Sequence, residues 1–584
     1  MKRLMRNVTI MRSLFIFCLA IATITLAQVS TPASSRPQDS ESQPPKGNSP
    51  SAAAPSLAAA PGSFDQLLDR VVQREHAFVS QMRHMHPLLE TYIQSLKPDK
   101  ELDVAPVSDK YFLGRLDMSH GTDDRSFLGR PGFGHRFMDK LSSLYSVKFL
   151  PLGFAQMVIV DEDFQKKYYD FTFVRREFLG EVRCLVIDVQ PKPRAGNTRF
   201  LGRIWVEDQD YNIVRADGTY SPHPRYGYYL HFDTWRLNLR PGVWLPAYIY
   251  SEESDLKTQM DRKLHYKSQT RLWGYDLQHL AHHEEFTQIQ VDSEQTVRDR
   301  SETSQDSSPV EAERAWERQA EDNALERLQK IGLLAPEGDV DKVLQTVVNN
   351  LIITNNLSIV PEVRCRVLLT LPLESFTIGH TIVTSRGLID VLPDEGALAM
   401  VLAHEFSHIA LGHRLDTKFA FNDRMVFSDE DTFERLNFSR SASDEEAADK
   451  KALELLANSP YKDKLASAGL FLKALQARAP ELKNLIQPHL GNSLGNGKTM
   501  RMSTLLTSSP QLQARRTDQV AALPLGSRIK LDPWSNRVEL MKTKPIVIQS
   551  AREKMPFEVT PFFPYLTRFA NPAPDKAALA PGGQ

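Results

Sequence analysis

A long succession of β-type segments in the first half of the chain most constrains its fold. From about residue 145 to 253, six segments in a row alternate apolar and polar residues and are rich in Val, Ile, Phe, Tyr and Trp. They read AQMVIVDE, YDFTFVRREFLG, VRCLVIDVQP, FLGRIWVEDQDYNIVRADGTY, YYLHFDTWRLNL and VWLPAYIYSEES, with turn residues such as Gly180 and Gly242 between them. Because no helical pattern interrupts the series, it predicts a large antiparallel sheet.

The chain has 584 residues, more than one hydrophobic core sustains, so several domains are expected. Helical spacing over 63–97 places a helix before the sheet. The fold class is α+β multidomain. Composition and periodicity predict six parts: a signal peptide (1–27), a Pro/Ser/Ala-rich leader (28–62), a helix plus antiparallel sheet (63–289), a polar linker (290–310), a mainly helical domain with a small sheet (311–525), and a partly β C-terminal extension (526–584).

The N-terminus is typical of an export signal. Lys and Arg residues precede an apolar run from Ser13 to Ala27, and Thr25-Leu26-Ala27 resembles a cleavage site for signal peptidase. The run is short for a membrane span of about 20 residues. The prediction is an exported protein, periplasmic or extracellular, and an uncleaved membrane anchor is the alternative.

The net charge limits the possible partners, and the cysteines raise the question of a disulfide. A net charge of −1 and a pI near 7 leave no basic field that would attract nucleic acid, so none is expected as a partner. After signal removal two cysteines remain, Cys184 and Cys365, each in an apolar strand-like run. They are either two buried free thiols or an interdomain disulfide, and the sequence leaves both open.

The segment VLAHEFSHIALGHR, residues 401–414, carries the strongest chemical signal. It lies in a predicted helix that opens at Asp394, a plausible N-cap. His404 and His408 stand at i and i+4, so both imidazoles point from one face of the helix toward a common metal. Glu405 is offset from that face and can reach a metal-bound water without binding the metal. The alternative is an apolar helix that carries these polar residues by coincidence.

A catalytic zinc needs a third protein ligand, which must come from outside this helix. The compact pattern HExxHxxGxxH fails because Leu411 and Arg414 stand where Gly and His are required. A second helix is predicted over SASDEEAADKKALELLA, residues 441–457. There Glu445 can bind the metal and Asp449 can hold the outer nitrogen of a ligand histidine. An ordinary acidic helix start is the alternative.

The HExxH motif followed by a distant ExxAD helix resembles metallopeptidase family forty-eight, the gluzincins of the HtpX and CAAX prenyl protease type. The lead-in TIVTSRGLIDVLPDEGALAMVLAHEFSHIALGH resembles that family too, over roughly residues 335–520. The resemblance implies a helical zincin domain with one Zn²⁺ per chain. By position it implies zinc ligands His404, His408 and Glu445, the base Glu405, and the supporting residues Asp449, His413 and Arg515.

The chain departs from the family where many members carry a His-Pro pair. Here Ser509-Pro510 stands in that place, and Arg515 follows at the matching distance. Arg515 and His413 are therefore candidates for steadying the oxyanion, and a surface salt bridge is the alternative for Arg515. The β-rich segment FLGRIWVEDQDYNIVRADG resembles lipoprotein-carrier proteins.

The resemblance implies a zinc metalloendopeptidase that hydrolyses peptide bonds of exported or envelope proteins, with a zinc-bound water activated by Glu405. Its partners would be protein or peptide substrates, and association with the envelope membrane or with lipoproteins is possible. The alternatives are a chaperone-like or lipoprotein-binding module on a zincin scaffold and a structural zinc protein. The segment HTIVTS, 380–385, is predicted to be an edge strand that binds substrate by strand addition.

Overall fold

In the computed structural model, the described residues all belong to one unit that begins at Pro61. The structure describes residues 61–99, 103–118, 123–126, 157, 160–161, 163–196, 199–221, 230–253, 266–277, 309–415, 433, 436–494, 501–512, 529–531, 538–540, 559 and 565–569. The predicted signal peptide and nearly all of the leader and linker lie outside these ranges. None of the helices within these ranges combines the length and the apolar content of a membrane span.

The first element, α1 (Phe64–Met82), is an amphipathic helix. Ser63 starts it, because its hydroxyl accepts a hydrogen bond from the Gln66 amide at 3.2 Å. The sequence predicted helical spacing over 63–97, but the helix ends at Met82 and a strand begins at Leu88. Leu88 pairs with both of its neighbouring strands, and this tertiary pairing outweighs the local spacing.

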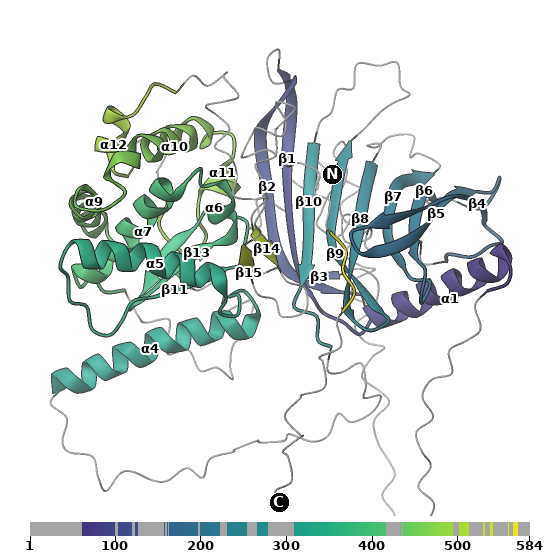
Figure 1. Cartoon of the computed structure of the whole chain (residues 1–584), viewed down its shortest axis with the longest axis horizontal. Helices are drawn as coiled ribbons and strands as arrows, with labels where there is room; N and C mark the ends of the chain where they lie inside the picture. The colour runs from purple at the N-terminus through teal and green to yellow at the C-terminus, as the bar shows by residue number, and fades with distance from the viewer. Residues whose placement is uncertain are drawn as a thin grey trace, which may run out of the picture. The chain divides into compact units, whose positions relative to one another are not determined.

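Ten antiparallel strands form one sheet in the order β3-β2-β1-β10-β9-β8-β7-β6-β5-β4 (Figure 1). The predicted antiparallel sheet is confirmed, and it is larger than the sequence indicated. The segment AQMVIVDE, 155–162, was predicted to be part of it, but its described residues Met157, Val160 and Asp161 are not in a strand. Its strands are β1 (Leu88–Asp99), β2 (Asp103–Asp117), β3 (Asp123–Ser126), β4 (Tyr169–Leu179), β5 (Val182–Pro191), β6 (Arg199–Glu207), β7 (Ile213–Ser221), β8 (Leu230–Arg240), β9 (Val243–Glu253) and β10 (Tyr266–Trp273).

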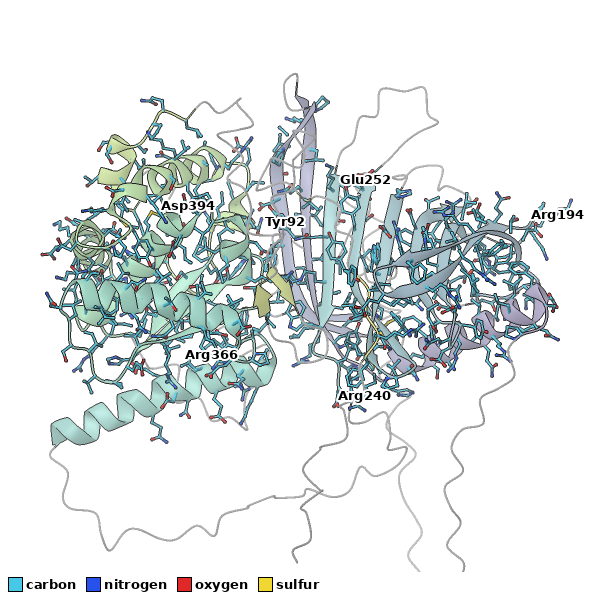
Figure 2. The ribbon with its side chains drawn as sticks, viewed as in Figure 1. Tyr92, Arg194, Arg240, Glu252, Arg366 and Asp394 are labelled. Carbon is cyan, nitrogen blue, oxygen red and sulfur yellow. The ribbon has the colours of Figure 1, made fainter. Side chains whose placement is uncertain are left out.

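The two faces of this sheet differ because side chains alternate along each strand. One face packs on α1, where a buried ion pair joins Arg236 of β8 to Glu75 at 2.7 Å. The other face is rich in Trp and Tyr, including Tyr92 of β1, which Figure 2 labels, and Trp205, Trp235 and Trp244. We call it the aromatic face.

The second half of the unit is helical with a small sheet, and the predicted α+β multidomain class is confirmed. Its helices are α4 (Pro309–Ile331), α5 (Asp339–Thr354), α6 (Arg386–Val391), α7 (Glu395–Ala410), α9 (Ala442–Ala457), η4 (Lys462–Lys464), α10 (Leu465–Arg478), α11 (Lys483–Ile486) and α12 (Ser503–Ser508). Its strands are β11 (Arg364–Leu368), β12 (Ser375–Ile378) and β13 (Thr381–Ser385), followed by a hairpin of β14 (Ile529–Leu531) and β15 (Val538–Leu540).

The small sheet has the order β11-β13-β12, which corrects one prediction. The segment HTIVTS forms β13, and β13 is the central strand, paired on one side with β11 and on the other with β12. Its backbone groups are therefore already used, and it cannot add a substrate strand. The edge strand beside α7 (Glu395–Ala410) is β12, a shorter segment with a less obvious strand pattern.

Two buried carboxylates on the large sheet hydrogen-bond to the helical half. Glu90 of β1 accepts from the Leu371 amide at 2.6 Å. Asp109 of β2 accepts from the Asn484 and Leu485 amides at 3.0 and 2.8 Å, at the start of α11. The sheet therefore supports the loop that leads into β12 and the segment after α10.

The cysteines are free and buried, so the predicted alternative of a disulfide is wrong for this structure. Burial raises the pKa of both Cys184 and Cys365 to about 12. A thiol with such a pKa stays protonated at neutral pH and is a poor nucleophile. Both side chains act as small apolar residues in the core.

Candidate metal centre

Helix α7 is buried along its length, from Gly396 to His408. Asp394, labelled in Figure 2, is its N-cap and accepts a hydrogen bond from the Ala397 amide at 2.9 Å, as predicted. Ser467 of α10 donates to the other carboxylate oxygen of Asp394 at 2.6 Å. These contacts fix the start of a helix whose last two turns carry the histidines.

His404 and His408 of α7 converge with Glu445 of α9. Their candidate ligand atoms all lie within 4.8 Å of one another, and all three residues are buried. The Nε2 atom of His404 is 3.1 Å from Glu445 Oε2, and that of His408 is 3.6 Å from Glu445 Oε1. The structure thus brings together the three residues that the resemblance implied as ligands.

The donor set fits a divalent zinc ion. Two imidazole nitrogens and one carboxylate oxygen are the set that catalytic zinc sites use. Burial lowers the pKa of His408 to about 3, so its ring is neutral and one of its two nitrogens has a lone pair available for a metal. Glu445 Oε2 is buried and faces both His404 Nε2 and the guanidinium of Arg501. A buried carboxylate oxygen is stabilised by a cation in contact with it.

The packing of α7 against α9 brings Glu445 to the histidines. Ser441 caps α9 by accepting from the Asp444 amide at 3.2 Å, and the helix begins where the sequence predicted. Ala448 and Ala452 are fully buried on the face of α9 that carries Glu445. Their small side chains let the two helices approach closely.

Asp449 lies one turn after Glu445 and faces the outer nitrogen of His404. Its Oδ1 atom is 2.9 Å from His404 Nδ1, although the angle falls outside hydrogen-bond geometry. Its Oδ2 atom accepts from the Met502 amide at 2.9 Å. Asp449 is therefore placed to orient a ligand ring, the position that the sequence predicted for it.

Glu405 is buried beside the ligands and is held by β12. The hydroxyl of Thr377 donates to Glu405 Oε2 at 2.8 Å. That bond leaves the second carboxylate oxygen for another partner and fixes the side chain next to the site. The cavity at the centre is lined by Ser375, Phe376, Thr377, His404, Glu405, His408, Phe438, Arg440, Glu445, Asn492, Leu494 and Arg501.

His413 was predicted as an oxyanion candidate, but its contacts are with the ligand shell. Its Nδ1 atom lies 2.9 Å from Nδ1 of His408, on the side of that ring away from Glu445. Its backbone carbonyl accepts from Arg440 at 2.8 Å. His413 is thus placed to orient His408. Arg515, the other oxyanion candidate, lies outside the described residues.

Sequence reasoning missed three polar residues that line the cavity around the candidate ligands. The guanidinium of Arg501 contacts the Glu445 carboxylate, and its Nη1 atom is 3.4 Å from His404 Nε2. The side-chain amide of Asn492 donates to Glu445 Oε1. Arg440 donates to the backbone carbonyls of His413 and Thr377. None of the three belongs to the HExxH or the ExxAD motif, so the sequence pattern did not indicate them.

The comparisons with known proteins bear on this half of the chain. Residues 342–518 match the model of Peptidase family M48. The match contains both histidines of HEFSH, Glu445 and Arg501, and we call this segment the M48 region. It confirms the resemblance seen in the sequence and implies that the M48 region is a metallopeptidase. No curated protein matches the chain.

Three solved structures are similar to the large sheet at low scores. A domain named for outer membrane lipoprotein sorting from Vibrio parahaemolyticus is 10% identical with a TM-score of 0.20, and covers 36% of this chain and 91% of its own. A DUF1329 family protein from Desulfovibrio piger is 9% identical with a TM-score of 0.18, and covers 35% and 92%. The MucA/MucB complex of Pseudomonas aeruginosa is 9% identical with a TM-score of 0.13, and covers 36% and 93%. TM-scores this low give no information about function.

Proposed function

We propose that the M48 region is a zinc-dependent endopeptidase with one Zn²⁺ per chain held by His404, His408 and Glu445. The observation that carries the proposal is the convergence of these three ligand atoms beside Glu405. A site with three protein ligands and a neighbouring carboxylate is typical of catalytic zinc, whereas structural zinc sites close with a fourth protein ligand. Among the described residues no fourth His, Cys, Asp or Glu joins the cluster.

Bound zinc would polarise the scissile carbonyl and increase the acidity of water at the site. Glu405 accepts the proton of the attacking water and delivers it to the leaving amine. Thr377 supports this role because its bond to Glu405 Oε2 leaves Oε1 to face the water. Asp449 and His413 orient the two ligand histidines from their outer sides.

Arg501 is the described guanidinium nearest the ligand atoms, and we assign it to the oxyanion. Only 15% of its side chain is exposed. Burial lowers its pKa to about 10, so the guanidinium remains charged at neutral pH. A buried cation next to the developing oxyanion stabilises the transition state more than it would in water. The contact with Glu445 keeps it in place.

The substrates we propose are polypeptides of the cell envelope or the extracellular space, because the N-terminus resembles an export signal. Substrate would lie along the edge strand β12, which borders the cavity. The Thr377 carbonyl on this edge already accepts from Arg440. A chaperone-like or lipoprotein-binding module with little proteolysis is the second candidate, favoured by the large sheet with its aromatic face.

The test compares wild-type protein with Glu405→Gln in zinc content and in cleavage of casein. Both proteins should bind about one zinc, since Glu405 is not a ligand, and only the wild type should cleave. The matched control is Glu446→Gln on the outer face of α9, where the side chain is 72% exposed and pairs with Lys450. Zinc without cleavage in the wild type would favour the binding module, and loss of zinc from all proteins would refute the site.

A further inference from the structure

A short C-terminal segment, residues 565–569, lies against the aromatic face of the large sheet. Figure 1 draws it in yellow over the sheet near β9. The segment reads YLTRF and has no regular secondary structure. Leu566 is fully buried and belongs to the core of the aromatic face, whereas Tyr565 is 58% exposed. We call residues 565–569 the tail segment.

The sheet holds the tail segment through its backbone. The Glu181 amide, in the turn between β4 and β5, donates to the Leu566 carbonyl at 2.8 Å. The Phe569 amide donates to Asn238 Oδ1 of β8 at 2.7 Å. Bonds of this kind recognise an extended backbone whatever its side chains.

Gly180 gives the tail segment room at the same turn. A Cβ atom at position 180 would lie 2.5 Å from the Leu566 carbonyl oxygen and 2.7 Å from the Leu566 amide nitrogen. The residue also has a φ of +68°, which favours glycine. The turn is thus shaped to let another backbone approach closely.

One side chain of the tail segment, that of Arg568, contacts a buried carboxylate of the sheet. Arg568 Nη2 lies 2.9 Å from Glu207 Oε2 of β6, and its guanidinium is 5.8 Å from the ring centre of Trp244. Glu207 is fully buried. Its carboxylate also accepts from the Gln209, Asp210 and Asn212 amides, which hold it in one orientation at the end of the strand.

The electrostatics of Glu207 fit a binding site for a cation. Burial would raise the pKa of Glu207, but hydrogen bonds from Asn212, Gln209 and Arg568 together lower it below the ordinary value. The carboxylate is therefore charged and buried at neutral pH. A buried charge of this kind is stabilised by an opposite charge in contact with it, and Arg568 supplies that charge.

We infer that the aromatic face around Glu207 and Trp244 is a binding groove for an extended polypeptide with an apolar residue two positions before an arginine. The tail segment occupies this groove as an exchangeable ligand within the same chain. The groove consists of the backbone donor at Glu181, the amide acceptor of Asn238 and the buried carboxylate of Glu207. An acyl chain would use neither the hydrogen bonds nor the charge, so the observations favour a peptide.

The experiment uses the full chain with Arg568→Glu, which places two carboxylates together and expels the tail segment. The probe is a fluorescent peptide with the sequence of residues 559–570, VTPFFPYLTRFA, and the readout is fluorescence anisotropy. The variant chain should bind this peptide at least about tenfold more tightly than wild type, since its groove is vacant. The same peptide with Arg568→Glu should bind the variant chain at least about tenfold more weakly.

The matched control is Arg194→Glu, the same charge change at an exposed residue that Figure 2 labels at the sheet. It should bind the peptide as wild type does. If Arg568→Glu does not fold, Leu566→Asp replaces it, because that change also expels the tail segment and leaves Glu207 intact. No readout depends on zinc or cleavage, so the result is independent of the proposed peptidase.

Three outcomes would overturn the inference. The first is equal binding of the two peptides to the variant chain, since this would show that Glu207 recognises no arginine. The second is failure of the variant chain to bind the wild-type peptide while it binds dansyl-labelled undecanoic acid, which would identify the face as a surface for acyl chains. Peptide binding that is equal in variant and wild type would show that the tail segment is no ligand of the groove.

Discussion

At the scale of single residues, the site combines expected ligands with an unexpected arginine. His404, His408 and Glu445 follow from spacing and from the family, whereas Arg501 follows from no pattern. Its loop joins the cluster because Met502, the next residue, donates its amide to Asp449. One carboxylate of α9 thereby faces a candidate ligand histidine and also binds the residue next to the arginine.

Replacing Arg501 by alanine should lower kcat by about 10² to 10³, because the developing oxyanion loses a buried cation. Zinc content and KM should change little, since the three ligands remain. Casein cleavage kinetics and metal analysis on the same samples check this. The control is Arg364→Ala, at a surface ion pair where Arg364 is 62% exposed. Loss of zinc from Arg501→Ala would mean instead that Arg501 holds Glu445 in place for the metal.

At the scale of elements, β12 connects the site to a titrating carboxyl group. Glu374 precedes β12, is buried to 2% exposure, and accepts from the Leu490 amide at 3.2 Å. Burial raises the pKa of Glu374 to about 7, despite hydrogen bonds from the His489 and Leu490 amides that lower it. The strand that holds Glu405 through Thr377 is thus anchored at a group that ionises near neutral pH.

The folded pKa of Glu374 lies above its value in the unfolded chain, so the folded state binds the extra proton. The free energy of unfolding should therefore fall by up to about 3 kcal/mol as pH rises from about 4.5 to 7, and it should level off above pH 7. Glu374→Gln should remove this part of the pH dependence and be the more stable protein at pH 8. Urea unfolding between pH 5 and 8 measures this pH dependence. The control is Glu395→Gln, at a carboxylate whose side chain is 51% exposed. An unchanged pH slope in Glu374→Gln would contradict the assignment.

At the scale of the whole molecule, the large sheet and the M48 region fold as one unit through buried polar contacts. Asp109 is the clearest case, because it accepts from the Asn484 and Leu485 amides and from the Tyr92 hydroxyl. The segment it holds leads to Leu490 and Asn492, the residues that support Glu374 and Glu445. The sheet therefore influences the geometry of the candidate metal site, although none of its described residues is a ligand in that site.

Asp109→Ala should lower the free energy of unfolding by about 1–3 kcal/mol, because it leaves buried amide donors without an acceptor. It should also weaken zinc binding, since the segment that carries Asn492 loosens. Thermal unfolding and zinc titration on the full chain test both effects. Asp170→Ala, an exposed strand carboxylate at 67% exposure, is the control. Lower stability with unaltered zinc affinity would show that the sheet supports the fold but not the site.

The sequence alone determined the local features of this protein: the cap and apolar faces of α7, the paired histidines, the alternation of β4 to β9, and the helix that carries Glu445. These follow from periodicity and side-chain chemistry within a few turns of chain. Long-range contacts in the folded chain set which strand of the small sheet is the edge and that Leu88 joins a strand. They also bring Arg501, Asn492 and Glu207 to their buried partners. Those outcomes depend on contacts between residues far apart in sequence, where pairing and burial outweigh local preference.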